Sequence, residues 1–240
     1  MTRLKARSDV RIGVRVMAAK TSEDFRIGRE NPTEAAKSGW PGNRREALLQ
    51  AAAEVFFERG YAATKIDAII DRAGGSKRNI YNEFGNKEGL FLALVARNAD
   101  MALSASPIEA NGARDVRETL TSFGQHLMAA YMSPSLIGIY RIAITEANRF
   151  PDLVRSFYEQ GPGRASSQLA GILEDARVRE ELRIDDCKLA AGHFVGMIRG
   201  DLHLQVVLGL RPPLLDEEIR DAVASAVDVF LDGVLPRRGT

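Results

Sequence analysis

Hydrophobic residues recur at the three- and four-residue spacing of an α-helix from Arg44 onward. The first predicted helix runs from Arg44 to a stop at Gly60. A second begins near Thr64, because Thr64 and Asp67, three residues later, have the spacing of a capping box. The predicted inward faces are Leu48, Ala52, Val55 and Phe56 in the first helix and Ile66, Ile69, Ile70 and Ala73 in the second.

Two further helices follow tight turns. The turn at residues 74–76 (Gly-Gly-Ser) leads into a short third helix that Ser76 can cap and that Gly85 ends. Asn86 can then cap a longer fourth helix. The predicted inward residues are Ile80 and Phe84 in the third helix and Leu90, Phe91, Leu94 and Val95 in the fourth.

The rest of the chain repeats the helical pattern with interruptions. Pro134 and Pro151 separate the first stripes, and Gly-Pro-Gly at residues 161–163 should break or kink a later helix. Two long stripes close the chain, over residues 187–208 and 216–234. No segment has the alternation of a strand, so the predicted fold class is all-α.

These elements divide the chain into three parts. Residues 1–42 contain Gly and Pro without sustained periodicity, which predicts a flexible basic N-terminal arm; a start at Met17 is an alternative. Residues 43–90 hold a predicted three-helix domain with a helix-turn-helix, and residues 91–236 hold a larger helical domain.

Charge is distributed unevenly along the chain. The net charge is +1, but residues 1–90 hold 17 Lys and Arg against 12 Asp and Glu, whereas the remaining residues hold 16 against 20. A basic front part with an acidic remainder suits a protein that presents one end to a polyanion, although surfaces often reach such an imbalance by chance.

Composition excludes several classes of protein. No stretch approaches the ~20 apolar residues of a membrane helix, and scattered arginines interrupt any secretory signal, which predicts a cytoplasmic protein.

The single cysteine, Cys187, excludes an internal disulfide. His193 and His203 are ten residues apart on one predicted helix, about 15 Å, so they cannot share an ion. The sequence also lacks a phosphate-binding loop and a nucleophile elbow, so no catalytic residue, cofactor or metal is predicted.

The third predicted helix has the form of a DNA-reading recognition helix. Ile80 and Phe84 would fix it from beneath, while its outer side offers Lys77, Arg78, Asn79, Tyr81 and Asn82. Arg can bind guanine and Asn adenine through paired hydrogen bonds, whereas Lys and Tyr reach phosphates. The start of the fourth helix at residues 86–87 adds free N–H groups suited to a phosphate. A helical hairpin with solvated charges is the alternative interpretation.

Residues 60–91, GYAATKIDAIIDRAGGSKRNIYNEFGNKEGLF, resemble the DNA-binding signature of the tetracycline-repressor (TetR) family. By position, the resemblance implies base contacts from Lys77, Arg78 and Asn79, and phosphate contacts from Thr64, Tyr81, Asn82 and Lys87. Residues 142–165, IAITEANRFPDLVRSFYEQGPGRA, are similar to the AefR-like subgroup of the C-terminal domain. The resemblance also implies a homodimer on a double-stranded DNA operator, a small-molecule effector and repression as the sign of control.

Two departures from the family pattern affect the function. Ile70 stands where the family has a small residue and Gly75 where it has a valine, and we expect Ile70 to fill the space left at Gly75. Asn79 replaces the usual hydroxyl residue, which implies a different operator preference. These departures leave open a ligand- or protein-binding helical module with lapsed DNA binding. An enzyme using the C-terminal cavity is a third hypothesis, without an acid–base or nucleophile pattern to support it.

An apolar effector cavity is expected between the helices of residues 91–236. The candidate lining residues are Phe123, His126, Leu127, Tyr131, Tyr140, Arg141, Phe157, Phe194 and Met197. Ordinary core packing is the competing interpretation for most of them.

Three glycines, Gly192, Gly196 and Gly200, recur every four residues in one predicted helix. Each costs about 1 kcal/mol relative to Ala, which predicts a close helix crossing within the subunit or across a dimer axis; tolerated glycines are the alternative. A four-helix dimer interface is predicted from these glycines together with Ile219, Val223, Ala226 and Phe230. A dimer would let two recognition helices reach the half-sites of a palindromic operator, about 34 Å apart.

Overall fold

A computed structural model describes residues 41–104 and 115–234 of the 240-residue chain. The described residues form ten α-helices and no strand, which confirms the predicted all-α class. The helices are α1 (Pro41–Arg59), α2 (Ile66–Ala73), α3 (Lys77–Phe84), α4 (Lys87–Ser104), α5 (Val116–Tyr131), α6 (Pro134–Glu146), α7 (Pro151–Gln160), α8 (Pro162–Val178), α9 (Cys187–Val207) and α10 (Asp216–Val234). The predicted N-terminal arm lies outside the described residues except for 41–42, which belong to α1.

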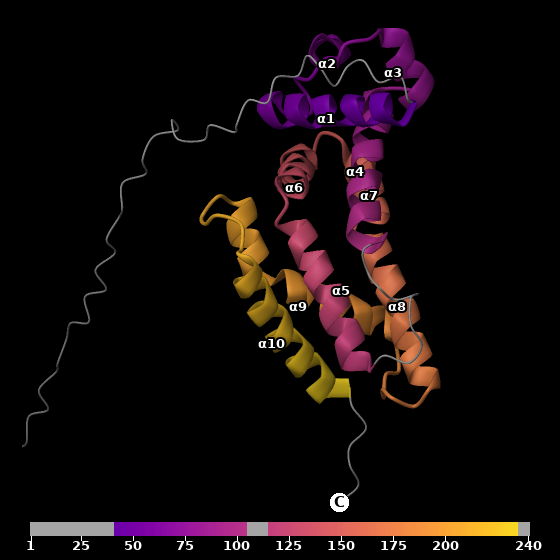
Figure 1. Ribbon diagram of the computed structural model, residues 1–240, viewed down its shortest axis with the longest axis vertical. Coiled ribbons are helices and arrows are strands. Elements are labelled where there is room, and N and C mark those ends of the chain that lie inside the picture. The colour runs from indigo at the N-terminus through magenta and orange to yellow at the C-terminus, as the bar shows by residue number, and fades with distance from the viewer. Residues whose placement is uncertain (1–40, 105–114, 235–240) are drawn as a thin grey trace, which may run out of the picture. The chain divides into compact units, whose positions relative to one another are not determined.

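Helix α1 supports the two short helices that follow it (Figure 1). The predicted inward face of α1 is confirmed, since Leu48, Ala52, Val55 and Phe56 are at most 5% exposed. Ile69 of α2 and Ile80 of α3 are 0% exposed in the same core. Burying side chains of this size contributes about 1.5–3 kcal/mol each, so this core fixes α2 on α1 and holds α3 against α2 and α4.

Surface ion pairs add to this packing. Arg72 of α2 binds Glu58 of α1 through two hydrogen bonds of 2.8 Å, and Arg45 of α1 donates to Glu83 of α3 at 3.1 Å. Both pairs are largely exposed, so each contributes at most about 1 kcal/mol. The buried isoleucines, rather than the ion pairs, therefore set the position of α2 and α3.

Glycines shape the turns on both sides of α3. Gly74, Gly75 and Gly85 have φ angles of 74°, 110° and 74°, in the left-handed region where a side chain would be strained. The predicted turn at 74–76 and the predicted end of the third helix at Gly85 are thus confirmed.

Of the predicted helix caps, the structure confirms some and contradicts others. Asn86 caps α4 as predicted, since its Oδ1 accepts from the Gly89 N–H at 2.8 Å. Ser76 occupies the N-cap position of α3, but its side chain accepts no capping hydrogen bond. The predicted Thr64–Asp67 capping box is wrong, because Lys65 is the N-cap of α2 and no side chain caps this helix.

Helix α4 connects the first three helices to the larger helical domain (Figure 1). It packs against α1 and α3 and also against α5, α6, α7 and α8. In that domain α8 packs on α9, and α10 packs on α5 and α9. Helix α4 therefore belongs to the core of both parts and crosses the expected boundary at residue 90. None of the described helices is by itself long and apolar enough to cross a membrane; α5 and α6 reach that length only together, bent by 70°.

Two long helices of the larger domain are interrupted. The predicted break at residues 161–163 is confirmed, because α7 ends at Gln160 and α8 begins at Pro162. The predicted helix over residues 187–208 is confirmed as α9, but it is kinked at Gly200, where φ is 43° and ψ is −158°. Only glycine adopts this backbone without strain, and it kinks α9 between Arg199 and His203.

Candidate DNA interface and effector cavity

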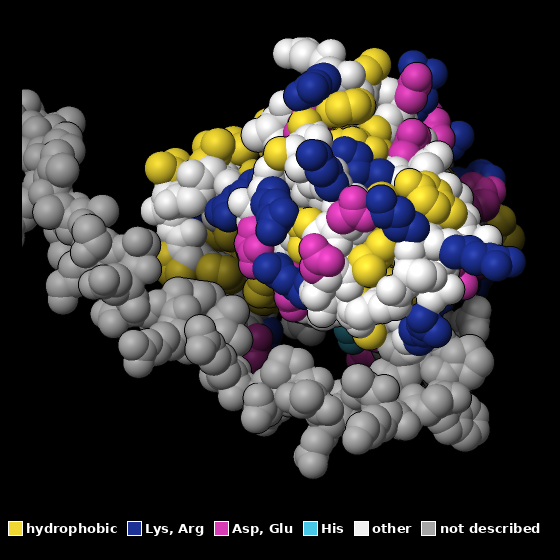
Figure 2. Space-filling view, turned by 90° about the horizontal axis from the view of Figure 1, so that it is seen from above, with side chains coloured by type: hydrophobic (Ala, Val, Ile, Leu, Met, Phe, Trp, Pro, Cys, Tyr) yellow, Lys and Arg dark blue, Asp and Glu magenta, His cyan; other side chains and the backbone are white. Residues whose placement is uncertain are grey.

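Helix α3 presents a polar outer side above its buried inner side. Arg78, Tyr81 and Asn82 are exposed, while Ile80 is fully buried beneath them. Arg78 forms no hydrogen bond or ion pair with the described residues, so its guanidinium is available to another molecule. Lys77 Nζ lies 2.8 Å from Asp67 in an exposed pair, which a phosphate can replace at little cost. Figure 2 shows Lys and Arg side chains spread over the face that α1–α3 form.

Asn79 and Gly75 adjoin Arg44 at the turn before α3. Asn79 is half-buried. A Cβ atom at position 75 would lie 3.2 Å from Arg44 Nη2 and 3.6 Å from Asn79 Nδ2, with no atom of Ile70 within 4 Å. The expected compensation between Ile70 and Gly75 is therefore wrong. Glycine is required at position 75 by the backbone, whose φ of 110° disfavours valine.

Thr64, a predicted phosphate contact, is part of the structural core. Its side chain is 2% exposed, and its hydroxyl donates to the carbonyls of Gly60 at 2.7 Å and Val55 at 3.3 Å. This hydroxyl holds the turn between α1 and α2 and is not directed to solvent. The predicted side-chain role of Thr64 at a phosphate is corrected accordingly.

Lys87, another predicted phosphate contact, is also engaged within the subunit. Its Nζ donates to the carbonyls of Tyr61, Ala62 and Thr64 at 2.9, 3.4 and 3.1 Å. The same ammonium lies 4.4 Å from the centre of the Tyr61 ring. Desolvation by burial lowers the pKa of Lys87. All three N–H donors are thus used, and Lys87 fastens the α1–α2 turn to the start of α4.

We expect Lys87→Met to destabilise the fold rather than to change only DNA affinity. Methionine keeps the aliphatic stem but removes hydrogen bonds from a charged donor, which predicts a loss of about 2 kcal/mol in urea unfolding. Lys188→Met, an exposed lysine of α9, is the matched control and should leave stability unchanged. Unaltered unfolding combined with a flatter salt dependence of DNA binding would restore Lys87 as a phosphate ligand.

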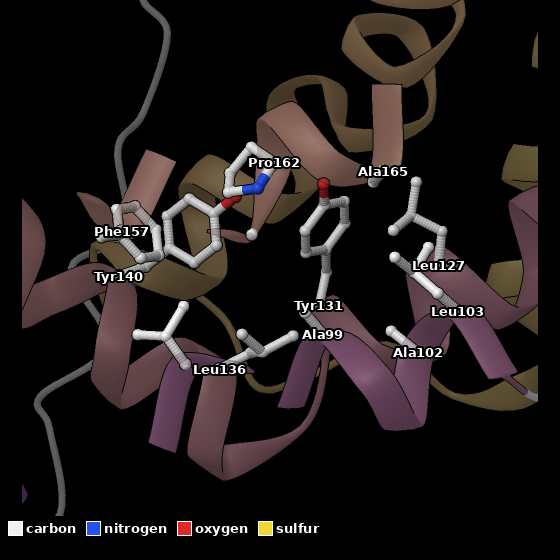
Figure 3. A pocket seen from close by; sticks show the side chains of 12 residues that line it. Ala99, Ala102, Leu103, Leu127, Tyr131, Leu136, Tyr140, Phe157, Pro162 and Ala165 are labelled. Carbon is white, nitrogen blue, oxygen red and sulfur yellow. The ribbon is translucent and has the colours of Figure 1, made fainter. Parts of the chain in front are cut away.

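A small apolar cavity lies between α4, α5, α6, α7 and α8 (Figure 3). About 30 Å³ of it is open to the centres of water-sized molecules, enough for one or two waters. A larger ligand therefore requires the surrounding helices to move. The cavity is lined by Val95, Ala99, Ala102, Leu103, Leu127, Tyr131, Leu136, Tyr140, Phe157, Gly161, Pro162 and Ala165.

Four of the nine predicted cavity residues line this space: Leu127, Tyr131, Tyr140 and Phe157. The other five are placed elsewhere. Phe123 and Phe194 are ordinary core, at 2% and 0% exposed. His126 bonds to the Ser122 carbonyl of its own helix, Arg141 donates to the carbonyls of Val206 and Val207, and Met197 is 37% exposed beside α10.

The cavity residues that the sequence interpretation missed come mainly from α4. Ala99, Ala102 and Leu103 continue the apolar side of that helix beyond Val95. Extending the predicted stripe by two turns would have identified them.

Buried polar groups cluster at one side of the cavity. The ring centroids of Tyr131 and Tyr140 are 5.9 Å apart, and the His203 ring lies 5.1 and 4.8 Å from them. The two hydroxyls and His203 Nε2 have no hydrogen-bond partner among the described residues. Burial, together with the charge of Arg199, lowers the pKa of His203 to about 4, so its imidazole is neutral at pH 7. Three unsatisfied polar atoms in an apolar core are costly unless a ligand engages them.

Helix α6 joins the cavity to the DNA-binding helices. Leu136 and Tyr140, early in α6, line the cavity. At the other end of the helix, Glu146 accepts from the Ala62 N–H at 3.0 Å. Gly138, between Leu136 and Tyr140, packs so closely on the Phe57 ring of α1 that a Cβ atom would lie 2.5 Å from it. Helix α6 therefore contacts the cavity, α1 and the turn before α2.

The outer surface of α9 and α10 carries the predicted glycines but not the other predicted interface residues. Gly192, Gly196 and Gly200 are exposed, and Cβ atoms there would meet nothing within 4 Å. Ile219, Val223, Ala226 and Phe230 are instead buried inside the subunit, at most 8% exposed. Ile219, Val223 and Ala226 form the inner face of α10 against α5 and α9, which corrects their predicted role at a dimer interface. Phe230 is also buried but lines the groove between α9 and α10, so its interface role stays a prediction.

Apolar side chains remain on the outer surface of α9 and α10. Leu189, Leu204 and Val229 are 57%, 49% and 62% exposed. A shallow groove between the two helices is lined by residues that include Gly192, Gly196, Met197 and Val229.

Among the residues that the structure describes, no group of three His, Cys, Asp or Glu side chains is placed to hold a metal ion.

Both parts of the chain match known families. Residues 48–94 match the bacterial regulatory proteins of the tetR family, and residues 118–233 match the AefR-like transcriptional repressor C-terminal domain. The solved structure of the flavonoid-responsive regulator FrrA is 34% identical, covers 82% of this chain and 99% of its own, and has a TM-score of 0.67.

Two curated relatives match mainly the DNA-binding part. The transcriptional activator FasR of Mycolicibacterium smegmatis is 44% identical over 87 residues, which are 36% of this chain and 36% of FasR. The transcriptional repressor AcnR of Corynebacterium glutamicum is 36% identical over 76 residues, which are 32% of this chain and 39% of AcnR. The matched part thus spans little more than a third of either relative's length.

Helix α3 has a buried inner side and a polar outer side, as a recognition helix does. Together with these family matches, it defines a helix-turn-helix DNA-binding transcriptional regulator rather than an enzyme. The chain belongs to the TetR family and has an AefR-like C-terminal domain.

Proposed function

We propose that the chain is a ligand-responsive repressor that binds a palindromic operator as a homodimer and is released by a small-molecule effector. Residues 43–90 act as the DNA-binding domain, and residues 91–236 act as the effector-binding and dimerisation domain. The observation that carries the proposal is the exposed Arg78, without an ion-pair partner among the described residues, above the fully buried Ile80. Because its ligand is chromosomal DNA, the protein acts in the cytoplasm.

The site residues divide by role. Lys77, Arg78 and Asn79 read base edges, while Tyr81 and Asn82 bind phosphates. The Asn79 amide lies beside Gly75 at the turn before α3. An amide at this position supports an operator preference that differs from those of relatives with a hydroxyl residue there.

Release by an effector follows from the small volume of the cavity. A ligand larger than one or two waters has to separate the helices around it, and two of these helices, α4 and α6, contact α1. Such a ligand binds the expanded form better than the closed one and so shifts the population between them. FrrA is described as flavonoid-responsive, which supports an effector in this domain.

The sign of control rests on the C-terminal domain. Its match is to an AefR-like repressor domain, whereas FasR is an activator and AcnR a repressor. Repression requires only that the dimer occupy an operator overlapping a promoter, so we propose it for this chain.

A dimer is proposed across the outer surface of α9 and α10. The exposed leucines and the glycine groove allow the same helices of a second copy to approach closely, which gives a four-helix interface. The apolar area is thereby covered without moving the inner face of α10.

Selection from random double-stranded DNA tests the proposal. We expect the full chain to enrich one inverted repeat with half-site centres about 34 Å apart, and to shift that fragment in a mobility assay at stated salt. Enrichment of no sequence over bulk DNA, with the protein folded, would instead favour the helical module with lapsed DNA binding.

A further inference from the structure

The polar cluster beside the cavity defines the chemistry of what the cavity can hold. Tyr131, Tyr140 and His203 are 3%, 7% and 4% exposed, yet each has a polar atom without a hydrogen-bond partner among the described residues. Figure 3 shows both tyrosine hydroxyls on the side of the cavity where Pro162 and Ala165 of α8 lie, with the Tyr140 hydroxyl next to Pro162. They come from different helices, α5 and α6, and so converge only in the folded domain.

A positive charge lies next to these hydroxyls. Burial raises the pKa of Tyr131 and Tyr140, the Arg199 charge acts in the opposite direction on both, and at Tyr140 the nearby Arg199 guanidinium and Tyr131 hydroxyl lower the pKa further. Arg199 is half-buried and forms no ion pair with the described residues. It lies directly before the kink of α9 at Gly200, and His203, after the kink, packs on both tyrosine rings.

The remainder of the cavity is apolar. Aliphatic and aromatic side chains such as Val95, Leu103 and Phe157 line it, and no acidic residue is among its lining. A hydrocarbon ligand would leave the hydroxyls without partners, and a cationic ligand would face Arg199. A ligand group that is negatively charged and accepts hydrogen bonds can accept from both hydroxyls and attract the Arg199 guanidinium.

We infer that the cavity binds an apolar molecule carrying one acidic oxygen group, a carboxylate or a phenolate, held by the Tyr131 and Tyr140 hydroxyls beside Arg199. This inference rests on the proposed effector site and names the class of ligand. The neutral His203 ring packs on both tyrosines and senses the charge of the bound group.

Four probes with one ring system and different head groups test the class. They are 2-naphthoate, 2-naphthol, naphthalene and 2-naphthylmethylamine, titrated calorimetrically into the full-length protein. We expect naphthoate or naphthol to bind at least tenfold more tightly than naphthalene, and the amine to bind more weakly than naphthalene. The first two probes distinguish a carboxylate from a phenol as the preferred head group.

Three variants assign the preference to residues. Tyr131→Phe and Tyr140→Phe should reduce the advantage of the acidic probe over naphthalene by about tenfold each, since one charge-assisted hydrogen bond is lost. They leave naphthalene binding unchanged. Tyr158→Phe, on an exposed tyrosine of α7, is the matched control and should change neither affinity.

The imidazole of His203 provides a readout that a purely structural role would not move. Its titration, followed by nuclear magnetic resonance, should have a midpoint near 4 without probe and a higher midpoint with the acidic probe bound, because a nearby anion favours the imidazolium.

Equal affinities for the four probes, preference for the amine, or no binding by any of them would overturn the assigned class. In those cases intact operator binding would leave the proposed regulatory function standing. Loss of operator binding in the unliganded protein would overturn the proposed function alone.

Discussion

Arg78→Ala is expected to abolish most of the preference for the selected operator over random DNA. A bidentate contact to guanine is worth about 1–3 kcal/mol, so its loss at both half-sites lowers operator affinity by roughly 30-fold or more. Non-specific binding should fall much less, because it depends on phosphates. Competition mobility shifts with operator and random fragments at fixed salt measure both affinities.

The surroundings of Arg78 allow the effect of Arg78→Ala to be assigned to DNA binding rather than to folding. Arg78 is exposed and forms no bond with the described residues, so alanine removes no internal contact and the fold should be unchanged. Arg155→Ala removes the same charge from an exposed position on α7 and is the matched control. Equal losses on operator and random DNA would show that Arg78 only anchors a phosphate.

The sequence predicted the DNA-binding helices well because their signals are local. The stripe from Leu48 to Phe56 and the glycines around α3 act within a few residues of the chain, and the structure has them as predicted. Thr64 and Lys87 were misassigned because their partners are carbonyls of a turn. A polar side chain at a phosphate position and one that holds a turn look alike in sequence.

The effector cavity was predicted less accurately for a physical reason. Periodicity identifies which residues face inward, but a cavity arises where inward side chains fail to fill the space between helices. Phe123 and Phe194 face inward as predicted and pack fully, whereas Ala99 and Ala102 leave room because they are small. The helices around the cavity, α4 to α8, must be placed before that difference is visible.

The dimer surface was also difficult to predict, because periodicity does not show whether an apolar stripe packs inside the subunit or remains on its surface. The interface prediction used Ile219 and Val223, which belong to the stronger apolar stripe of α10. In the structure these side chains are buried in the core of the subunit. Weaker apolar positions such as Leu204 and Val229 remain outside. The kink at Gly200 was also hidden, because one glycine in a helical stripe does not reveal its backbone angles.

Gly196→Arg is expected to convert the proposed dimer to a monomer and to lower operator affinity by roughly 100-fold or more, because two linked half-site contacts become one. Within the subunit the substitution is tolerated, since a Cβ atom at Gly196 meets nothing within 4 Å and arginine favours a helix over glycine. Across the proposed interface, however, it places a charge and a long side chain in the glycine groove.

Gly171→Arg supplies the matched control for this variant. Gly171 is an exposed helical glycine of α8 that also meets nothing within 4 Å, but it lies outside the groove between α9 and α10. Sedimentation velocity should give a dimer for this control and a monomer for Gly196→Arg, with the same helical circular dichroism for both. A Gly196→Arg protein that stays dimeric and binds the operator normally would place the dimer interface elsewhere on the molecule.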